Sequence, residues 1–125
     1  MRHALLMTVA LAASAVPAVP AVAQDATKVD SKHYKVEFEN DQVRVLRITY
    51  GPREKSVMHE HPPNVAIFLT DVQGMFTLPD GKKQEVTPKA GSVQYDPGGK
   101  HLPENTGDKG FELVLVELKS KPTGK

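Results

Sequence analysis

Short stretches in which apolar and polar residues alternate, separated by turn residues, run along the chain from residue 33 onward. In residues 33–38, Tyr34, Val36 and Phe38 alternate with charged residues, which predicts a strand that buries one face. Residues 43–50 are rich in β-branched side chains, and strand-like segments recur at 57–61, 65–69, 74–78, 83–86, 92–95 and 111–118. Because sustained helical periodicity is missing, the pattern predicts an all-β domain of about seven to nine short antiparallel strands, arranged as a sandwich or barrel.

Glycine, proline and asparagine mark the connections between these segments. Asp80-Gly81 lies between two strand-like segments and predicts a β-hairpin. Pro97-Gly98-Gly99 predicts a turn, and residues 105–108 predict a loop before the last apolar segment.

The first 23 residues differ from the rest and have the features of a signal peptide. A short positive start, Met1-Arg2-His3, precedes an apolar run over residues 4–16, and Ala21-Val22-Ala23 has the small residues of a cleavage site. An uncleaved membrane anchor is the alternative, but Pro17 and Pro20 interrupt a run that is shorter than the roughly 20 apolar residues a spanning helix needs. We therefore expect cleavage after Ala23, and a secreted or periplasmic protein without a stable membrane anchor.

The chain after residue 23 has three parts. Residues 24–32 are polar and have no periodic pattern of apolar residues, which predicts a flexible leader. Residues 33–118 are predicted to form one domain, and residues 119–125 a flexible tail. The chain contains no cysteine, so a packed core must stabilise it, helped by a metal or by self-association. Beyond Arg2, basic and acidic residues are equal in number and interleaved, which argues against a nucleic-acid partner.

Three histidines are the strongest candidates for chemistry. His59 and His61 are two residues apart, so a strand would point both imidazoles toward the same face. His101 follows the glycine-rich turn at residues 97–99. Imidazole is a common ligand of transition metals, and a third imidazole from a distant strand would complete one face of a coordination shell.

These histidines lie in two motifs that resemble those of the cupin superfamily. The first motif has the form Gly-x5-His-x-His-x3,4-Glu-x6-Gly; the sequence matches it at His59, His61 and Gly74, with Arg53 at the first glycine. The second has the form Gly-x5-Pro-x-Gly-x2-His-x3-Asn; the sequence matches it at Gly91, Pro97, Gly99 and Asn105, with His101 one residue early. The resemblance spans residues 43–118 and implies an antiparallel double-stranded β-helix, or jelly-roll barrel.

The glutamate of the first motif, a metal ligand in the family, has no counterpart here. Residues 65–67 are Val-Ala-Ile, and strand alternation points Glu60 away from its neighbouring histidines. The resemblance then implies a three-histidine site, like that of the thiol dioxygenases and diketone-cleaving dioxygenases of the superfamily. Without the carboxylate, the charge of a divalent ion is less compensated, so an anionic chelating molecule would be a suitable further ligand.

Different classes of function agree with this site. One is a metal-dependent small-molecule enzyme, such as a dioxygenase, with iron as the first choice of metal and manganese, nickel, zinc or copper as alternatives. Another is a non-catalytic module that binds a metal or a small ligand without turnover, and the missing glutamate also agrees with a vestigial site. A third is a metal that only stabilises the barrel.

Other residues are weaker candidates. Phe76 and Tyr95 are candidates for the substrate pocket, and Asn105 is expected to fix its loop through hydrogen bonds to the backbone. His33 is expected at the surface. Arg44 and Arg47 lie on opposite faces of one strand, so one of them is a candidate partner for an anionic substrate.

The resemblance also suggests a homodimer, because cupins often pair through their N-terminal strands. The apolar residues on both faces of 111–118 agree with a dimer, or with a strand buried inside one barrel.

Overall fold

The computed structural model describes residues 24–120; the expected signal peptide and residues 121–125 lie outside the described residues. A short helix, α1 (Ala26–Val29), comes first. Nine strands follow it within the described residues: β1 (Tyr34–Glu39), β2 (Val43–Tyr50), β3 (His59–His61), β4 (Asn64–Phe68), β5 (Gly74–Thr77), β6 (Lys83–Val86), β7 (Val93–Asp96), β8 (Gly99–Asn105) and β9 (Phe111–Leu118). No helix within residues 24–120 is long and apolar enough to cross a membrane.

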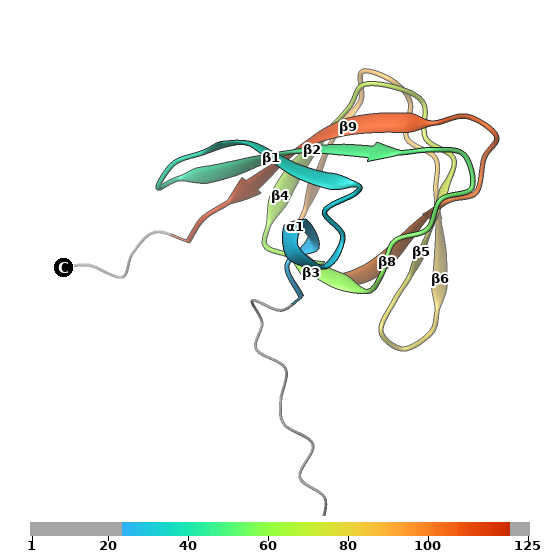
Figure 1. Cartoon of the computed structure of the whole chain (residues 1–125), viewed down its shortest axis with the longest axis horizontal. Coiled ribbons are helices and arrows are strands. Elements are labelled where there is room, and N and C mark those ends of the chain that lie inside the picture. The colour runs from blue at the N-terminus through green and yellow to red at the C-terminus, as the bar shows by residue number, and fades with distance from the viewer. Residues whose placement is uncertain (1–23, 121–125) are drawn as a thin grey trace, which may run out of the picture.

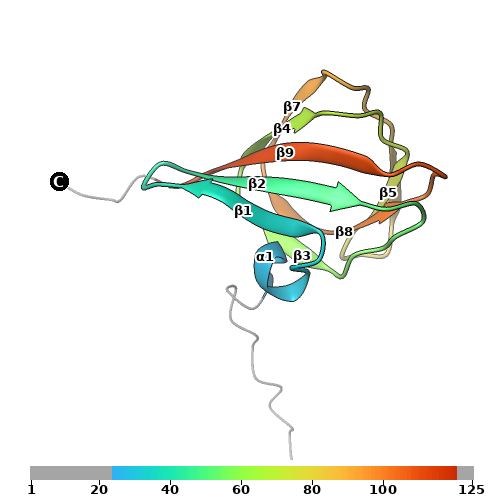
Figure 2. The same ribbon diagram turned by 45° about the horizontal axis from the view of Figure 1, so that its top comes forward.

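The strands form two antiparallel sheets that curve around a common interior (Figures 1 and 2). The larger sheet has the order β1-β2-β9-β4-β7, and the smaller has the order β3-β8-β5-β6. Because consecutive strands change sheet between β2 and β3, β3 and β4, and β4 and β5, the two layers are wound together. The prediction of an all-β, antiparallel double-stranded β-helix is confirmed.

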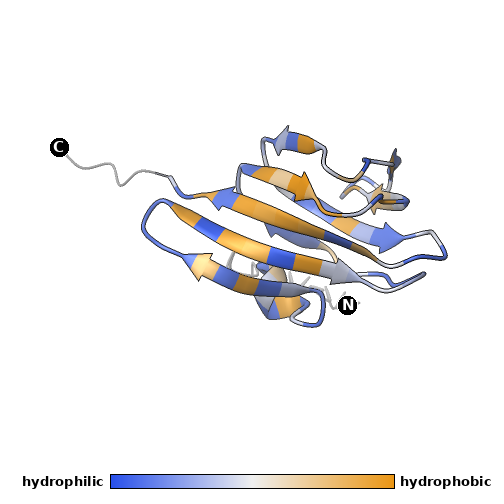
Figure 3. Ribbon diagram, turned by 90° about the horizontal axis from the view of Figure 1, so that it is seen from above, coloured by the Kyte–Doolittle hydropathy of each residue, from blue (hydrophilic) through white to orange (hydrophobic). Residues whose placement is uncertain are grey.

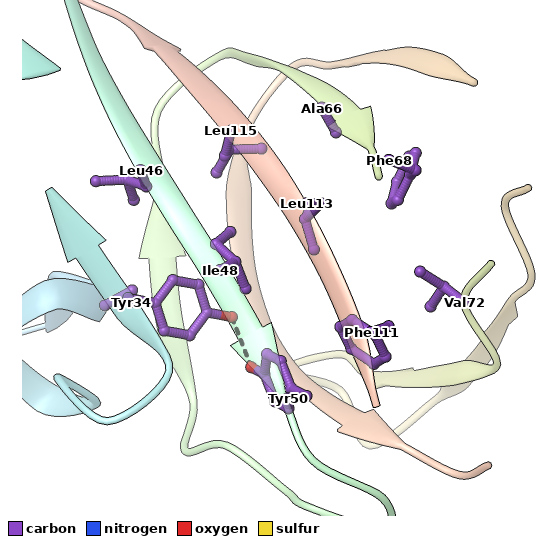
Figure 4. Packing of buried hydrophobic residues seen from close by; sticks show 11 residues of the cluster. Tyr34, Leu46, Ile48, Tyr50, Ala66, Phe68, Val72, Phe111, Leu113 and Leu115 are labelled. Carbon is purple, nitrogen blue, oxygen red and sulfur yellow. Dashed lines mark hydrogen bonds between the residues drawn. The ribbon is translucent and has the colours of Figure 1, made fainter. Parts of the chain in front are cut away.

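The core lies between the sheets and is built mainly by the inward faces of β2 and β9 (Figure 4). Leu46, Ile48 and Tyr50 alternate with outward residues on β2, and β9 contributes its own alternating set, Phe111, Leu113 and Leu115. Each large apolar side chain that is fully removed from water contributes about 1.5–3 kcal/mol of transfer free energy. Two tyrosines place polar atoms in this core: the hydroxyls of Tyr34 and Tyr50 lie 2.7 Å apart and hydrogen-bond each other.

Residues 24–32, expected to be a flexible leader, are partly folded onto the barrel. Asp25 caps α1 by accepting a hydrogen bond from the backbone of Thr27 at 2.9 Å, and it pairs with Arg44 at 2.7 Å. Ala26 is completely buried, and Asp25 forms a β-bridge with Glu60. The prediction was wrong because a helix of one turn is too short to show a periodic pattern. The residues that hold this segment in place, Arg44 and Glu60, are also distant from it in the sequence.

The prediction that Tyr34, Val36 and Phe38 share a buried face is wrong. The pairing of β1 with β2 shifts register between Val36 and Phe38, so a β-bulge interrupts the alternation. Tyr34 stays in the core, whereas Val36 and Phe38 are about half exposed.

No strand was predicted from the sequence between the turn at residues 97–99 and the loop at residues 105–108, where the structure has β8. Gly99 and Pro103 are unfavourable strand residues and hide its character in the sequence. In the structure β8 pairs with both β3 and β5, and the carbonyl of Pro103 accepts a hydrogen bond from the backbone of Ser56 at 2.9 Å. This strand matters because it brings His101 into the interior.

Candidate metal centre

The structure brings the three candidate histidines together at one end of the barrel interior. His59 and His61 point to the same side of β3, and His101 on β8 is the direct cross-strand partner of His59. The ring centroids of His59 lie 4.8 Å from His61 and 4.9 Å from His101, and the His61–His101 centroid distance is 5.3 Å. His59 and His61 are buried, and His101 is partly buried.

The separation of the ring nitrogens fits a shared ion. The Nε2 atoms of His59 and His101 lie 3.1 Å apart. Two nitrogens that bind one ion at about 2.1 Å are separated by about 3.0 Å at a right angle and about 3.4 Å at a tetrahedral angle. All three residues offer a ligand nitrogen within 4.8 Å of the others, so the set can hold one transition-metal ion.

Hydrogen bonds at the opposite nitrogens orient two of these rings. The Nδ1–H of His59 donates to the carbonyl of Val57 at 2.8 Å, and the Nδ1–H of His61 donates to the carboxylate of Glu117 at 2.7 Å. Each bond directs the Nε2 lone pair toward the interior. Such partners commonly fix the tautomer and orientation of metal-binding histidines.

Glu117 was not identified from the sequence, although it is the best-anchored residue behind the site. It is only 1% exposed, and its second carboxylate oxygen lies 2.6 Å from Nε of Arg44, which in turn pairs with Asp25. Burial alone would raise the pKa of Glu117, but the hydrogen bonds from His61 and Arg44 lower it, so the carboxylate remains ionised. Its negative charge would stabilise a cation bound to the His61 imidazole.

A buried environment keeps the other two imidazoles neutral. Burial, together with the neighbouring histidines, lowers the pKa of His59 to about 4 and that of His101 to about 3. Both rings therefore carry a free lone pair near neutral pH. A metal ion can bind them without displacing a proton from these two residues.

His61 and His101 border a cavity of about 280 Å³ between the sheets, and His59 lies directly behind them. Its walls are largely apolar and include Phe68, Phe111 and Leu115 from the larger sheet. Phe76 on β5 lies beside the site, with its ring centroid 4.5 Å from that of His101. Ala66 lines the cavity in the region where the family motif has its glutamate, so no carboxylate is supplied from that segment.

The remaining expected residues occupy varied positions. Tyr95 borders the cavity, but it is 65% exposed and pairs with Val65 on β4. Asn105 donates through Nδ2 to the carbonyls of Gly51 and Lys109 at 2.9 and 2.8 Å, which confirms its expected role in fixing the loop.

Two of the motif glycines, and the glycine between Pro97 and Gly99, have backbone conformations that glycine favours. Gly91 and Gly99 have positive φ, and so does Gly98. A Cβ on Gly98 would lie 2.6 Å from the carbonyl oxygen of His61, so only glycine lets the turn after Pro97 pass so close to β3. Arg53, at the motif's first glycine, also has a positive φ, of 62°, a conformation that glycine adopts more readily.

Two expectations about charged and polar residues are wrong. Arg44 lies on the inward side of β2, but it pairs with Glu117 and Asp25, and Arg47 pairs with Glu37 and Glu112. Neither arginine is directed at the cavity. His33 is not at the surface: it is 5% exposed and stacks on Tyr50 with ring centroids 4.2 Å apart, while its Nδ1 bonds Asp30.

Substituting Glu117 with glutamine should weaken metal binding without removing a ligand. Glutamine has a similar shape but lacks the charge that holds Arg44 and polarises His61. Loss of such an outer partner typically costs about 10–100-fold in affinity, and we expect a loss in this range. Competition with a chromophoric chelator measures it, with Glu112→Gln on the outward face of the same strand as the control. Equal affinities for the two variants would contradict this role for Glu117.

Comparison with solved structures places this architecture among the cupins. A cupin domain from Bordetella pertussis Tohama I superposes with a TM-score of 0.65 at 24% identity, covering 70% of this chain and 92% of that one. A Cupin 2 conserved barrel domain protein from Salinispora arenicola gives 0.55 at 19% identity, over 86% and 91% of the two chains. The polyketide cyclase RemF from Streptomyces resistomycificus gives 0.53 at 19% identity, over 71% and 66%.

The chain has the cupin fold, and its three clustered histidines fit a three-histidine site of the kind found on that fold. No protein-family model matches the sequence. A comparison with curated proteins likewise returns no match.

Proposed function

We propose that this protein holds one divalent transition metal through His59, His61 and His101 and uses it to act on a small molecule, as a dioxygenase or a related metalloenzyme. The observation that supports this most directly is the convergence of the three imidazoles, two of which, His61 and His101, line an apolar cavity. Iron is the metal we propose first. Manganese, nickel, zinc and copper share the preference for imidazole and are the alternatives.

A metal bound here would supply a Lewis acid and, for iron, a centre for electron transfer to dioxygen. The protein's own residues would position the substrate and exclude water from it. Phe76 and the apolar walls would exclude water and contact a hydrophobic part of the molecule. The hydroxyls of Tyr34 and Tyr50 remain protonated because burial raises their pKa values. Since one of them donates to the other, this pair would offer a single O–H to a bound molecule.

The chemistry of the donor set favours an anionic chelating group on the substrate. Three neutral imidazoles leave the positive charge of a divalent ion uncompensated, and Ala66 supplies no carboxylate from the cavity wall. We therefore propose a small molecule that has two adjacent oxygen or sulfur donors and an apolar remainder.

Oxygen consumption tests this proposal. The protein is loaded anaerobically with Fe(II), mixed with aerated solutions of thiols, diketones and phenols, and followed with an oxygen electrode. We expect uptake with at least one class and none with His101→Ala under the same conditions. A metal-loaded protein that consumes no oxygen with any of them would favour the second function below.

That second function is a module that binds a metal or small ligand without turnover. The specific observation in its favour is that the cavity residue packed against the ring of His59 is Tyr34, with the two ring centroids 4.8 Å apart. Its hydroxyl is held by Tyr50, and its pKa is raised well above the usual value by burial, so it is a poor proton acceptor near neutral pH.

We also propose that the protein is exported and works outside the cytoplasm. The support is the pattern of residues 1–23, with its positive start, apolar run and Ala21-Val22-Ala23.

A further inference from the structure

The N-terminal segment, meaning residues 25–33, lies against the strand that carries two of the three ligand histidines. It comprises α1 and the turn that leads into β1, and Figures 1 and 2 show α1 beside β3. Ala26 is completely buried, and Asp25 forms a parallel β-bridge with Glu60, the residue between the two histidines of β3. The segment therefore belongs to the surroundings of the metal centre, although it precedes both histidine motifs.

A first polar connection runs from this segment to His59. The hydroxyl of Ser56 donates to the carboxylate of Asp30 at 2.5 Å, so its lone pairs are free to accept from Nδ1 of His59, 3.3 Å away. The Nδ1–H of His59 is thus shared between this hydroxyl and the carbonyl of Val57. Asp30 also accepts from Nδ1 of His33 at 2.7 Å, and its side chain is 10% exposed. Asp30 therefore fixes the direction of a hydroxyl that contacts a metal ligand.

A second, separate connection leads from the segment to His61. Nη1 of Arg44 donates to Asp25 at 2.7 Å, and Nε of the same arginine donates to Glu117 at 2.6 Å. The other carboxylate oxygen of Glu117 accepts from His61 at 2.7 Å. Figure 3 shows hydrophilic bands interrupting the hydrophobic colour of β2, the strand that carries Arg44. This arginine joins a carboxylate of the N-terminal segment to the carboxylate behind a metal ligand.

The charges along the second connection give the N-terminal segment an electrostatic role. Glu117 and Arg44 alone would cancel, because they carry opposite unit charges. With Asp25 in place the three groups carry one net negative charge, which would stabilise a cation bound to His61. Burial alone would raise the pKa of Asp25, but hydrogen bonds from Arg44 and Thr27 lower it, so this carboxylate is ionised. Docking of the segment therefore places negative charge behind a centre whose ligands are neutral imidazoles.

The residue that links the segment to His59 is held from the opposite side by β8. The backbone N–H of Ser56 donates to the carbonyl of Pro103 at 2.9 Å, and the preceding residue, Lys55, forms a β-bridge with Glu104. These backbone contacts do not involve the hydroxyl. A substitution that removes only the hydroxyl therefore breaks the first connection and leaves the backbone bonds in place.

We propose that the N-terminal segment positions two of the three imidazoles through its carboxylates Asp25 and Asp30, so that its docking on the barrel and metal binding strengthen each other. Because such coupling is reciprocal, the docked segment raises metal affinity by the factor by which the metal stabilises docking. Loss of an outer partner of a metal ligand typically costs about 10–100-fold in affinity, and we expect a coupling of this size. The proposal rests on the metal site proposed above and requires no catalysis.

Undocking the segment without changing either connection tests this coupling. Ala26→Glu puts a charge at a completely buried position and should release the segment, whereas Val29→Glu adds the same charge on the same helical turn where the side chain is 38% exposed. We expect Ala26→Glu to bind Zn(II) about 10–100-fold more weakly than Val29→Glu, measured by competition with a chromophoric chelator. Circular dichroism checks that the barrel of both variants is folded.

The first connection is tested alone by Ser56→Ala. Ser92→Ala is the matched control, because its hydroxyl bonds the carbonyl of Lys89 within a turn. Ser56→Ala should bind Zn(II) about tenfold more weakly than this control. In the unaltered protein Zn(II) should also slow hydrogen–deuterium exchange of the hydrogen-bonded α1 amides, and it should slow it less in Ser56→Ala. A residue that only stabilises the fold would not make this exchange depend on the metal.

Equal Zn(II) affinities within either pair of variants would overturn the proposal, as would exchange of the α1 amides that Zn(II) does not change. The three-histidine site would stand in both cases. An unaltered protein that binds no Zn(II) would instead refute the metal site itself, and the coupling with it. If Ala26→Glu does not fold, the pair of serine variants and the exchange measurement decide.

Discussion

Replacing His101 with alanine is expected to abolish stoichiometric binding of a divalent transition metal. The substitution leaves His59 and His61 as the two protein ligands of the set, and it removes the nitrogen that lies 3.1 Å from that of His59. Loss of an outer partner of a metal ligand already costs about 10–100-fold in affinity, and loss of the ligand itself should cost more. Equilibrium dialysis against a limiting concentration of Fe(II), Zn(II) or Ni(II), followed by elemental analysis, measures the stoichiometry.

The neighbouring residue on β8 provides the control for this substitution. Lys100 is exposed, and it is the cross-strand partner of Glu60 on the outward side of the same strand pair. Lys100→Ala should bind one ion per chain, as the unaltered protein does. An unchanged stoichiometry in His101→Ala, with retained folding by circular dichroism, would refute the assignment of His101 as a ligand.

The part of the site that could be predicted from the sequence is the part encoded locally. His59 and His61 share a face because side chains in a strand alternate with a period of two, and this holds wherever the strand lies. Their pairing with His101 depends on the register of β3 against β8, which spans about forty residues of intervening chain. The prediction that His101 joins the pair rested on the metal-binding chemistry of three imidazoles and on the family motifs, since no strand was predicted over residues 100–104.

Glu117 shows why the hydrogen-bonding partners behind the site were missed. It lies in a segment of near-continuous apolar character, and its partners Arg44 and His61 are 73 and 56 residues away. A signal was nevertheless present: Phe111, Leu113 and Leu115 are inward residues of β9, and the next inward position carries the charge. A lone acid at a position that the alternation assigns to the core indicates a buried partner.

The prediction that His33 lies at the surface was wrong for a different physical reason. The alternation around it suggested a polar outward position, but β1 begins at Tyr34, so the strand period does not apply to His33. The preceding turn buries it against Tyr50 and Asp30 instead. Residues at the ends of strands are placed by the connections, which depend on tertiary contacts that no local pattern contains.

Lowering the pH should unfold the metal-free protein over the range from about 6.5 down to about 3. Burial and the neighbouring imidazoles lower the pKa of His59 to about 4 and that of His101 to about 3, whereas an unfolded chain has a histidine pKa near 6.5. Between these pH values the two histidines are protonated in the unfolded chain but remain neutral in the folded chain. The free energy of unfolding therefore has its full value above pH 6.5 and decreases as the pH falls through this window.

The expected loss is substantial, because one pKa unit corresponds to about 1.4 kcal/mol and each histidine contributes on the order of 3 kcal/mol. Urea unfolding of the metal-free protein at several pH values measures it. His101→Gln removes one of the two titrating groups, so its curve of free energy against pH should be flatter by about half. Acidic residues such as Asp25 titrate identically in both proteins, and the difference between the two curves isolates His101. A free energy of unfolding that is constant between pH 6.5 and 4 would contradict the burial of neutral imidazoles. If the folded chain keeps these two histidines neutral, protonation of the same residues in the unfolded chain must lower the free energy of unfolding as the pH falls.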